Sequence, residues 1–212
     1  MHRIGVFGGS FNPIHFGHLL VADDVGEILG LDRTLFVPAA VPPHKISADL
    51  APARHRFHMT ALAVRERPGF EACDLELKRP GRSYTVDTLE GLAGQGDLHL
   101  LIGSETFLDL LSWKEPERVA RLARLVVVPR NSAAFDPDGP EVQHVLSTLG
   151  LPGFCRAEQA APPAPILVTA SSLPISASDL RRRAREGRSL AYRMPSAVAA
   201  YIRRHGLYGV AR

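Results

Sequence analysis

The sequence predicts an α/β fold in three layers, with a central parallel sheet and helices on both of its faces. Short β-rich runs alternate with helical patterns along the chain, and repeated strand–helix–strand units of this kind form parallel sheets. Residues 98–102 and 125–128 are almost entirely apolar, which is typical of strands buried on both faces. We therefore expect ligands to bind outside the carboxyl ends of the strands.

Six runs of the sequence are expected to be strands. Most are short and apolar, whereas residues 70–77 alternate between apolar and polar side chains, which favours a strand with one buried face. The expected strands are residues 3–7, 34–38, 70–77, 98–102, 125–128 and 166–169.

Eight segments are expected to be helices. In residues 16–29 the apolar side chains, among them Leu19, Val25 and Leu29, recur at helical spacing. Pro68 and Gly69 follow the second helix and provide its stop signal. The expected helices are residues 16–29, 53–66, 85–92, 107–111, 117–122, 141–149, 176–185 and 195–205.

The remaining long segments are expected to be loops within one domain. Residues 39–52 contain Pro-Pro-His-Lys, residues 131–140 contain Asp-Pro and Asp-Gly turns, and residues 152–165 are rich in proline and alanine. The chain has 212 residues and no internal repeat. We expect one domain over residues 1–212, with a C-terminal helical portion at about 176–212.

The composition indicates a globular chain with a mildly basic balance. Hydrophobic residues make up 45% of it, and its net charge of +3 suits anionic substrates without requiring nucleic acid. Cys73 and Cys155 lack metal or redox spacing and are expected to be reduced, buried thiols, although a disulfide stays open. No run of 18 apolar residues and no signal peptide is seen, so we expect a cytoplasmic chain without a membrane span.

Residues 5–19 carry the most specific motif of the chain. An apolar strand runs into Gly8 and Gly9, and His15 and His18 then open a helix. Backbone N–H groups and the positive end of a helix favour an anion, and glycines let the backbone come close to it. Two imidazoles on the first helical turn can then donate hydrogen bonds to phosphoryl oxygens.

This motif differs from two common phosphate-binding loops. It is neither a Walker A loop nor a Gly-x-Gly-x-x-Gly fingerprint, but it matches Gly-Gly-x-Phe-x-Pro-x-His-x-Gly-His, which fixes seven positions. One alternative is an ordinary turn with two surface histidines. The other is a metal site, but a transition metal requires three or four ligands and no nearby Cys or Glu completes the set.

A second motif, Ile-Ser-Ala-Ser-Asp-Leu-Arg, occupies residues 175–181. A serine N-cap opens a helix there, and Arg181 follows Ser178 by three residues, so both side chains can face one phosphate. A guanidinium suits bidentate binding of phosphate. The arginines that follow fit an ordinary solvated helix face.

Together these motifs resemble the bacterial nicotinate-nucleotide adenylyltransferases of the nucleotidylyltransferase superfamily. The resemblance spans most of the chain and implies a Rossmann-like fold and adenylyl transfer from ATP to nicotinate mononucleotide, giving deamido-NAD and pyrophosphate. The stretch Ser-Tyr-Thr-x-Asp-Thr-Leu at residues 83–89 separates this family from shorter relatives. The other matching segments are residues 8–18, 43–45, 101–103, 113, 175–181, 201–202 and 206–208.

The resemblance also implies roles for individual residues. His18 would donate to the α-phosphoryl oxygens with His15 beside it, while Lys45 and Arg181 would hold phosphates. The residues assigned to ATP are Gly8, Gly9, Ser10, Phe11, His15, His18, Gly103, Glu105, Ile175, Ser178 and Arg181. Those assigned to nicotinate mononucleotide are Ser10, Lys45, Tyr84, Thr85, Trp113 and Arg130. Mg²⁺ is expected to bind mainly through the ATP phosphates.

Three of these assignments carry a qualification. Trp113 is either an aromatic platform for the nicotinate or core filler, and its polar neighbours favour the platform. Glu105 stands where the family usually has Asp, which puts a contact to ribose or a cation in doubt. Ala177 replaces a common serine and removes one hydroxyl donor, although the backbone N–H groups remain.

Two competing functions stay open at this point. Pantetheine-phosphate adenylyltransferases and cytidylyltransferases share the first motif, but the chain length, Tyr84-Thr85 and Trp113 argue against them. A nucleotide-sensing or nucleic-acid-binding module would use the five arginines at 181–188, but no aromatic stacking residues interleave with them. We expect nucleotide substrates, no nucleic acid and no membrane; the oligomeric state and the preference for nicotinate over nicotinamide stay open.

Overall fold

The computed structural model describes residues 2–43, 49–129, 135–157 and 162–209. It confirms the predicted parallel sheet, whose strand order is β3-β2-β1-β4-β5-β6 with every described pairing parallel. The strands are β1 (Arg3–Gly9), β2 (Arg33–Pro38), β3 (Phe70–Ala72), β4 (Asp97–Gly103), β5 (Arg124–Val128) and β6 (Ile166–Leu167).

The central position of β1 determines where a ligand can enter. The chain builds outward from β1 through β2 and β3, then returns to pair β4 with the other edge of β1. Gly5 marks this centre, with Thr34 beside it on one strand and His99 on the other. Where strand order reverses in this way, a crevice opens at the carboxyl ends of the two strands. Here those ends are Gly9 and Gly103.

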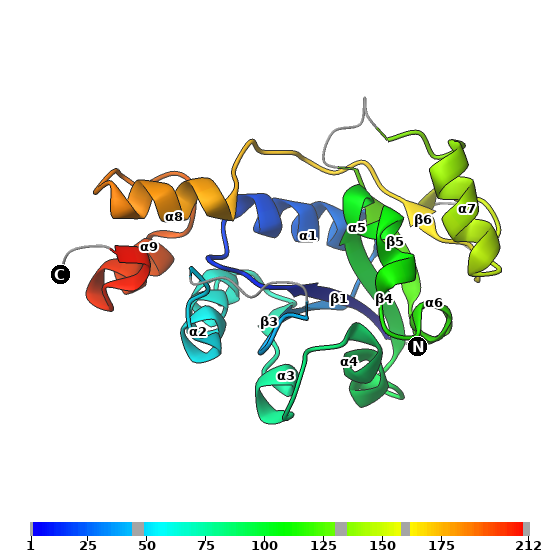
Figure 1. The fold of residues 1–212 in the computed structure, drawn as a ribbon, viewed down its shortest axis with the longest axis horizontal. Helices are drawn as coiled ribbons and strands as arrows, with labels where there is room; N and C mark the ends of the chain where they lie inside the picture. Colours follow the sequence, from blue (N-terminus) through cyan, green and yellow to red (C-terminus); the bar gives the residue numbers. More distant parts are fainter. Residues whose placement is uncertain (1, 44–48, 130–134, 158–161, 210–212) are drawn as a thin grey trace.

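The helices cover both faces of the sheet. Figure 1 shows α1 along one side and α3 and α4 on the other, with α8 and α9 far from α7. The helices are α1 (Phe16–Leu29), α2 (Ala53–Val64), α3 (Leu75–Lys78), α4 (Thr85–Leu92), α5 (Ser104–Leu108), η1 (Leu110–Ser112), α6 (Pro116–Leu122), α7 (Pro140–Thr148), α8 (Ala177–Arg185), α9 (Ser196–Arg204) and η3 (Leu207–Gly209).

Two hydrophobic clusters fill the space between the sheet and its helices. Side chains of a strand alternate between faces, so Leu100 and Ile102 join a cluster with α4, α5, α6 and α7. Leu101 and Val126 point the other way, into a cluster with α1, α2, α8 and α9. The nearly continuous apolar runs of β4 and β5 are thereby explained, because both of their faces are buried.

The expected strand at residues 70–77 is wrong over its second half. Strand β3 ends at Ala72, and residues from Leu75 onward form the short helix α3. An ion pair between Lys78 Nζ and Asp74 Oδ1 at 2.8 Å spans this turn. In an alternating strand over residues 70–77 the polar side chain of Glu76 would face solvent. In the structure its carboxylate is buried and accepts a hydrogen bond from Thr88 Oγ1 at 2.6 Å.

Other predicted boundaries change by a few residues. The helix expected at 107–111 is split into α5 and η1, and the strand expected at 166–169 ends at Leu167. Cys73 and Cys155 are free thiols as expected, but each is only half-buried. Among the described residues, no helix combines the length and the apolar character needed to cross a membrane.

Candidate active site

The two motif histidines lie at the amino end of α1. His15 is the N-cap residue, with extended backbone at φ −152° and ψ 171°, and His18 is the third residue of the helix. Their side chains form a reciprocal capping box, each accepting from the backbone N–H of the other's residue. The ring centroids are 3.8 Å apart with a 30° tilt, so the first turn of α1 holds both imidazoles as one unit.

The capping box also determines the tautomer of His18. Its Nδ1 accepts from the His15 backbone N–H at 3.3 Å, so the neutral ring carries its proton on Nε2. The side chain is half-buried, while that of His15 is only 6% exposed. An Nε2–H donor at the positive end of a helix suits a phosphoryl oxygen.

Two motif glycines have distinct steric roles. A Cβ on Gly17 would lie 3.0 Å from His15 Nδ1, so a side chain there would displace the imidazole. A Cβ on Gly8, in contrast, would meet nothing within 4 Å. Gly8 therefore borders open space at the carboxyl end of β1, where the strand order reverses.

The ring of Phe11 is buried among other aromatic side chains, although the residue is assigned to ATP. Its ring is 2% exposed and packs at centroid distances of 5.7 Å from Phe7, 6.0 Å from Phe36 and 5.2 Å from His18. Its φ of 41° lies in the left-handed region, an arrangement that costs free energy for a residue with a side chain. The ring supports His18, and the backbone is the part of Phe11 left for a ligand.

The second motif is brought to the first by the fold. The carbonyl oxygen of Ile175 lies 3.9 Å from the position that a Cβ on Gly17 would take. Arg181 Nη1 donates to the carbonyl oxygen of Asn12 at 3.0 Å, across 169 positions of sequence. Its Nε is buried with no hydrogen-bond partner among the described residues. Arg181 thus contacts the first motif directly, which its assignment as a phosphate ligand did not predict.

Helix α8 begins as predicted. The Ser176 side chain accepts from the backbone N–H of Asp179 at 3.2 Å and caps the helix. Ser178 is exposed, with its hydroxyl 3.1 Å from that of Ser176. Ala177 occupies the first turn without a hydroxyl, and its backbone N–H remains at the helix start.

Arg56 of α2 is a site residue that the sequence did not reveal. The residue is fully buried, and its guanidinium donates to three carbonyl oxygens, of Ala51 at 2.8 Å, Ser10 at 2.8 Å and Ala40 at 3.1 Å. Burial lowers the pKa of Arg56, but a guanidinium keeps its charge in proteins. Arg56 joins the glycine motif to both ends of the 39–52 segment, and nothing in the sequence distinguishes it from the neighbouring Arg54 of the same helix.

Two of the residues assigned to nicotinate mononucleotide, Tyr84 and Thr85, lie at the amino end of α4. The backbone N–H of Ser83 donates to Val41 O at 3.0 Å, and Val41 N–H donates to Ser83 Oγ at 3.2 Å. Lys114 reaches back to this end, with Nζ 2.9 Å from Asp87 Oδ1 and 5.1 Å from the Tyr84 ring centroid. The hydrogen bond to Asp87 raises the pKa of Lys114.

Thr85 and Trp113 belong to the same neighbourhood. Thr85 is the first residue of α4, and Trp113 follows η1 directly. Trp113 is half-buried and packs against the cluster under α4, so one part of the indole serves the core and another part faces outward. The buried part acts as core filler, and the aromatic platform for nicotinate stays a prediction for the outward part.

The remaining assigned residues fall into two groups. Gly103 ends β4 and Glu105 is exposed in the first turn of α5, both at the carboxyl edge of the sheet. Lys45 and Arg130 lie outside the described residues.

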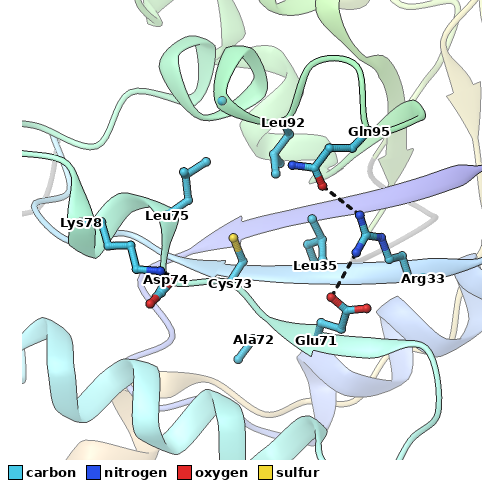
Figure 2. A pocket seen from close by; sticks show the side chains of 11 residues that line it. Arg33, Leu35, Glu71, Ala72, Cys73, Asp74, Leu75, Lys78, Leu92 and Gln95 are labelled. Carbon is cyan, nitrogen blue, oxygen red and sulfur yellow. Dashed lines mark hydrogen bonds and ion pairs between the residues drawn. The ribbon is translucent and has the colours of Figure 1, made fainter.

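A hollow of about 280 Å³ lies elsewhere, at the outer edge of the sheet beside β3 and α3. In Figure 2, Arg33 extends between Glu71 and Gln95, which it contacts at 3.3 Å and 2.8 Å. Burial raises the pKa of the Cys73 thiol in this hollow, which makes it a poor nucleophile. None of the predicted site residues lines the hollow.

The donor set at the described carboxyl edge does not form a metal cage. Throughout the part of the chain that the structure describes, no three His, Cys, Asp or Glu side chains are grouped to hold an ion. His15 and His18 use side-chain atoms in the capping box. A direct histidine–metal site, one of the two alternatives to phosphate binding, therefore lacks a third ligand among these residues.

Comparisons with known proteins show which family the chain is similar to. The family model described as cytidylyltransferase-like matches residues 6–183. A probable nicotinate-nucleotide adenylyltransferase of Thermus thermophilus is 46% identical over 97% of this chain and 99% of its own. One from Roseiflexus sp. is 43% identical over 97% of each chain.

Solved structures show the same fold at lower sequence identity. The nicotinic acid mononucleotide adenylyltransferase of Plasmodium falciparum, complexed with NaAD, superposes with a TM-score of 0.73. The alignment covers 100% of this chain and 99% of that one, at 18% identity.

Proposed function

The chain belongs to the cytidylyltransferase-like family and, within it, to the nicotinate-nucleotide adenylyltransferases, and from this membership we infer its reaction. It transfers the adenylyl group of ATP to nicotinate mononucleotide, giving nicotinate adenine dinucleotide and pyrophosphate in NAD biosynthesis. The observation that carries this function is the convergence of residues 8–18 and 175–181 beyond the carboxyl end of β1, joined by the bond from Arg181 to Asn12.

The reaction is an in-line displacement at the α-phosphorus. A phosphate oxygen of nicotinate mononucleotide forms the new bond to this phosphorus, while the bond to the bridging oxygen of pyrophosphate breaks. The second pKa of a phosphate monoester is near ~6, so the nucleophile is mostly dianionic at neutral pH and needs no general base. Catalysis therefore consists of positioning two polyanions and stabilising the charge of the transition state.

The geometry supports specific roles for the residues around the crevice. His18 Nε2–H would donate to an α-phosphoryl oxygen, with the His15 ring 3.8 Å away fixing its orientation. Arg181 would add charge from the side of α8, and the amino ends of α1 and α8 would contribute N–H groups. We propose Tyr84, Thr85 and the outward part of Trp113 for the nicotinate end of the substrate.

Mg²⁺ fits a site of this composition if it enters on the triphosphate. The described residues offer no three-ligand group, and Mg²⁺ commonly keeps its waters and binds through substrate phosphates with one or two carboxylates. Glu105 at the carboxyl end of β4 is the carboxylate we propose for it. The ion would neutralise charge on the phosphates.

A pyrophosphate-release assay tests the proposed function. The purified chain is incubated with ATP and, in separate reactions, nicotinate mononucleotide, nicotinamide mononucleotide or phosphopantetheine, and products are identified by mass spectrometry. We expect nicotinate adenine dinucleotide to be the dominant product. Turnover with phosphopantetheine alone would assign the chain to another branch of the superfamily, and ATP binding without pyrophosphate release would indicate a non-catalytic module.

A further inference from the structure

Asn12 is the centre of a buried polar cluster behind the proposed site. Its side chain is nearly inaccessible, and both polar atoms of the carboxamide are used. Oδ1 accepts from the backbone N–H of Ala51 at 3.1 Å, and Nδ2 donates to the carbonyl oxygen of Asp49 at 2.9 Å. Because one partner is a donor and the other an acceptor, the orientation of the amide is determined.

The C-terminal turn supplies a further donor to this carboxamide. Tyr208 of η3 donates its hydroxyl to Asn12 Oδ1 at 2.9 Å, across 196 positions of sequence. Burial raises the pKa of Tyr208, so the phenol stays protonated and acts as the donor. Its backbone has φ 60° and ψ 24°, a left-handed conformation that persists in non-glycine residues only when the surroundings impose it.

The turn that carries Tyr208 is packed against α8. A Cβ on Gly209 would lie 3.2 Å from Arg185 Cγ, so the backbone approaches this helix closely. The guanidinium groups of Arg56 and Arg181 both act electrostatically on the Tyr208 hydroxyl. The phenol therefore lies near two cations that also bond to residues 10–12, through Ser10 O and Asn12 O.

Asn12 lies between the glycines and the histidines of the first motif. A shift of its backbone would displace the N–H groups that precede it and the N-cap His15 that follows it by three residues. Its side chain meanwhile holds the segment before α2 through Ala51. Any group that fixes Asn12 therefore fixes the nucleotide-binding backbone on both sides of the crevice.

We propose that Tyr208 is a positioning residue for nucleotide binding, acting through Asn12 from the opposite end of the chain. This rests on the proposed function, because the crevice that it shapes is the one that would bind ATP and nicotinate mononucleotide. The phenol does not itself contact the reacting atoms. It locks the Asn12 carboxamide, so that the C-terminal turn contributes to the affinity of the site.

The test compares the loss of the Tyr208 hydroxyl with the loss of another tyrosine hydroxyl, that of Tyr201. Tyr208→Phe is the variant, and Tyr201→Phe is the control, because the Tyr201 hydroxyl lies on α9 at 2.9 Å from His55 Nδ1 and 3.1 Å from His58 Nδ1. We expect Tyr208→Phe to raise KM for the nucleotides about fivefold, as for the loss of one buried hydrogen bond, with little change in kcat. Tyr201→Phe should keep the wild-type KM.

Amide hydrogen exchange followed by NMR gives a readout that does not depend on turnover. The Ala51 N–H should exchange faster in Tyr208→Phe than in the wild type, and at the wild-type rate in Tyr201→Phe.

In an Asn12→Ala background, Tyr208→Phe should add no further rise in KM, because the acceptor is already gone. An unchanged KM in Tyr208→Phe, an equal rise in both tyrosine variants, or unaltered exchange at Ala51 would overturn the proposal. A wild-type chain inactive with nicotinate mononucleotide would instead overturn the function, and the exchange result would still judge the link from Tyr208 to Ala51.

Discussion

The two sides of the sheet are packed by different means. On the side of α4, α6 and α7 the core is a large apolar cluster, and its buried polar residues bond over shorter distances in sequence: Thr88 to Glu76 spans 12 positions and Val41 to Ser83 spans 42. The side of α1, α2 and α8 also has an apolar cluster, but at its carboxyl end it buries Asn12, His15 and Arg56. There the hydrogen bonds of Arg181 and Tyr208 to Asn12 span 169 and 196 positions.

This difference separates the residues that mainly stabilise the fold from those that determine the geometry of residues 8–18. Apolar burial is non-directional and scales with area, so the first side holds the sheet together without defining the positions of the atoms in residues 8–18. Hydrogen bonds to buried groups are directional, and each unsatisfied partner is costly. The second side therefore determines where the backbone of residues 8–18 lies. Variants on the two sides should differ accordingly in what they change.

The largest effect is expected for His18→Ala. Removing one preorganised donor to a developing charge lowers kcat by about 10²–10³. Pyrophosphate release under saturating ATP and nicotinate mononucleotide measures this change, and circular dichroism confirms that the variant is folded. A variant with near wild-type turnover would remove His18 from the reaction and leave the capping box as its role.

The position of His18 could be predicted because its evidence is local. Gly8, Gly9, His15 and His18 lie within eleven positions, and their spacing alone places two imidazoles on the first turn of a helix. The alternation of strands and helices is local in the same sense, which is why the sheet and helix α1 match their expected positions. Patterns of this kind are set by backbone periodicity and need no knowledge of distant contacts.

Arg56 and Glu76 could not be predicted for the opposite reason. Each is a charged residue, and charged side chains are mostly exposed in proteins unless they are paired. Arg56 is buried because Ser10, Ala40 and Ala51 offer carbonyl oxygens that converge only in the folded chain. Glu76 is buried because Thr88 arrives from the next helix. Tertiary contacts override the local pattern at both positions.

Arg56→Met tests the polar side directly. Three carbonyl oxygens lose their donor, so we expect the free energy of unfolding to fall by roughly 3–4 kcal/mol. KM for the nucleotides should rise as well, since Ser10 O loses its partner. Urea denaturation followed by circular dichroism measures the first quantity and pyrophosphate release the second. A variant that is less stable but has wild-type KM would show that Arg56 only stabilises the fold.

Leu89→Ala is the matched test on the apolar side. Leu89 is fully buried in α4, and truncation of a buried leucine costs about 3 kcal/mol. Because the cavity forms away from residues 8–18, KM for ATP should stay at its wild-type value in the folded fraction. The variant is measured below its unfolding midpoint. A marked rise in KM for ATP would contradict the separation of the two sides.

The smallest effect concerns acid stability and His99 of β4. Burial, reinforced by Arg124 and opposed by the hydrogen bond to the Asp97 carbonyl, lowers the pKa of His99 below its usual 6.5. The unfolded chain therefore takes up the proton first, and below pH 6.5 unfolding is favoured by proton binding. The contribution of His99 is fully present above that pH and is lost as pH falls through its lowered pKa.

His99→Gln should accordingly flatten the loss of stability on acidification. The amide keeps a donor for the Asp97 carbonyl but cannot be protonated in this range. Urea midpoints are compared between pH 7.5 and pH 5 for the wild type, His99→Gln and His144→Gln, the last removing an exposed imidazole of α7. A residual slope should remain from His55, whose pKa burial also lowers. If the urea midpoint falls by the same amount between the two pH values in all three chains, the imidazole of His99 is not a source of the acid sensitivity. Its neutral form would then not stabilise the sheet.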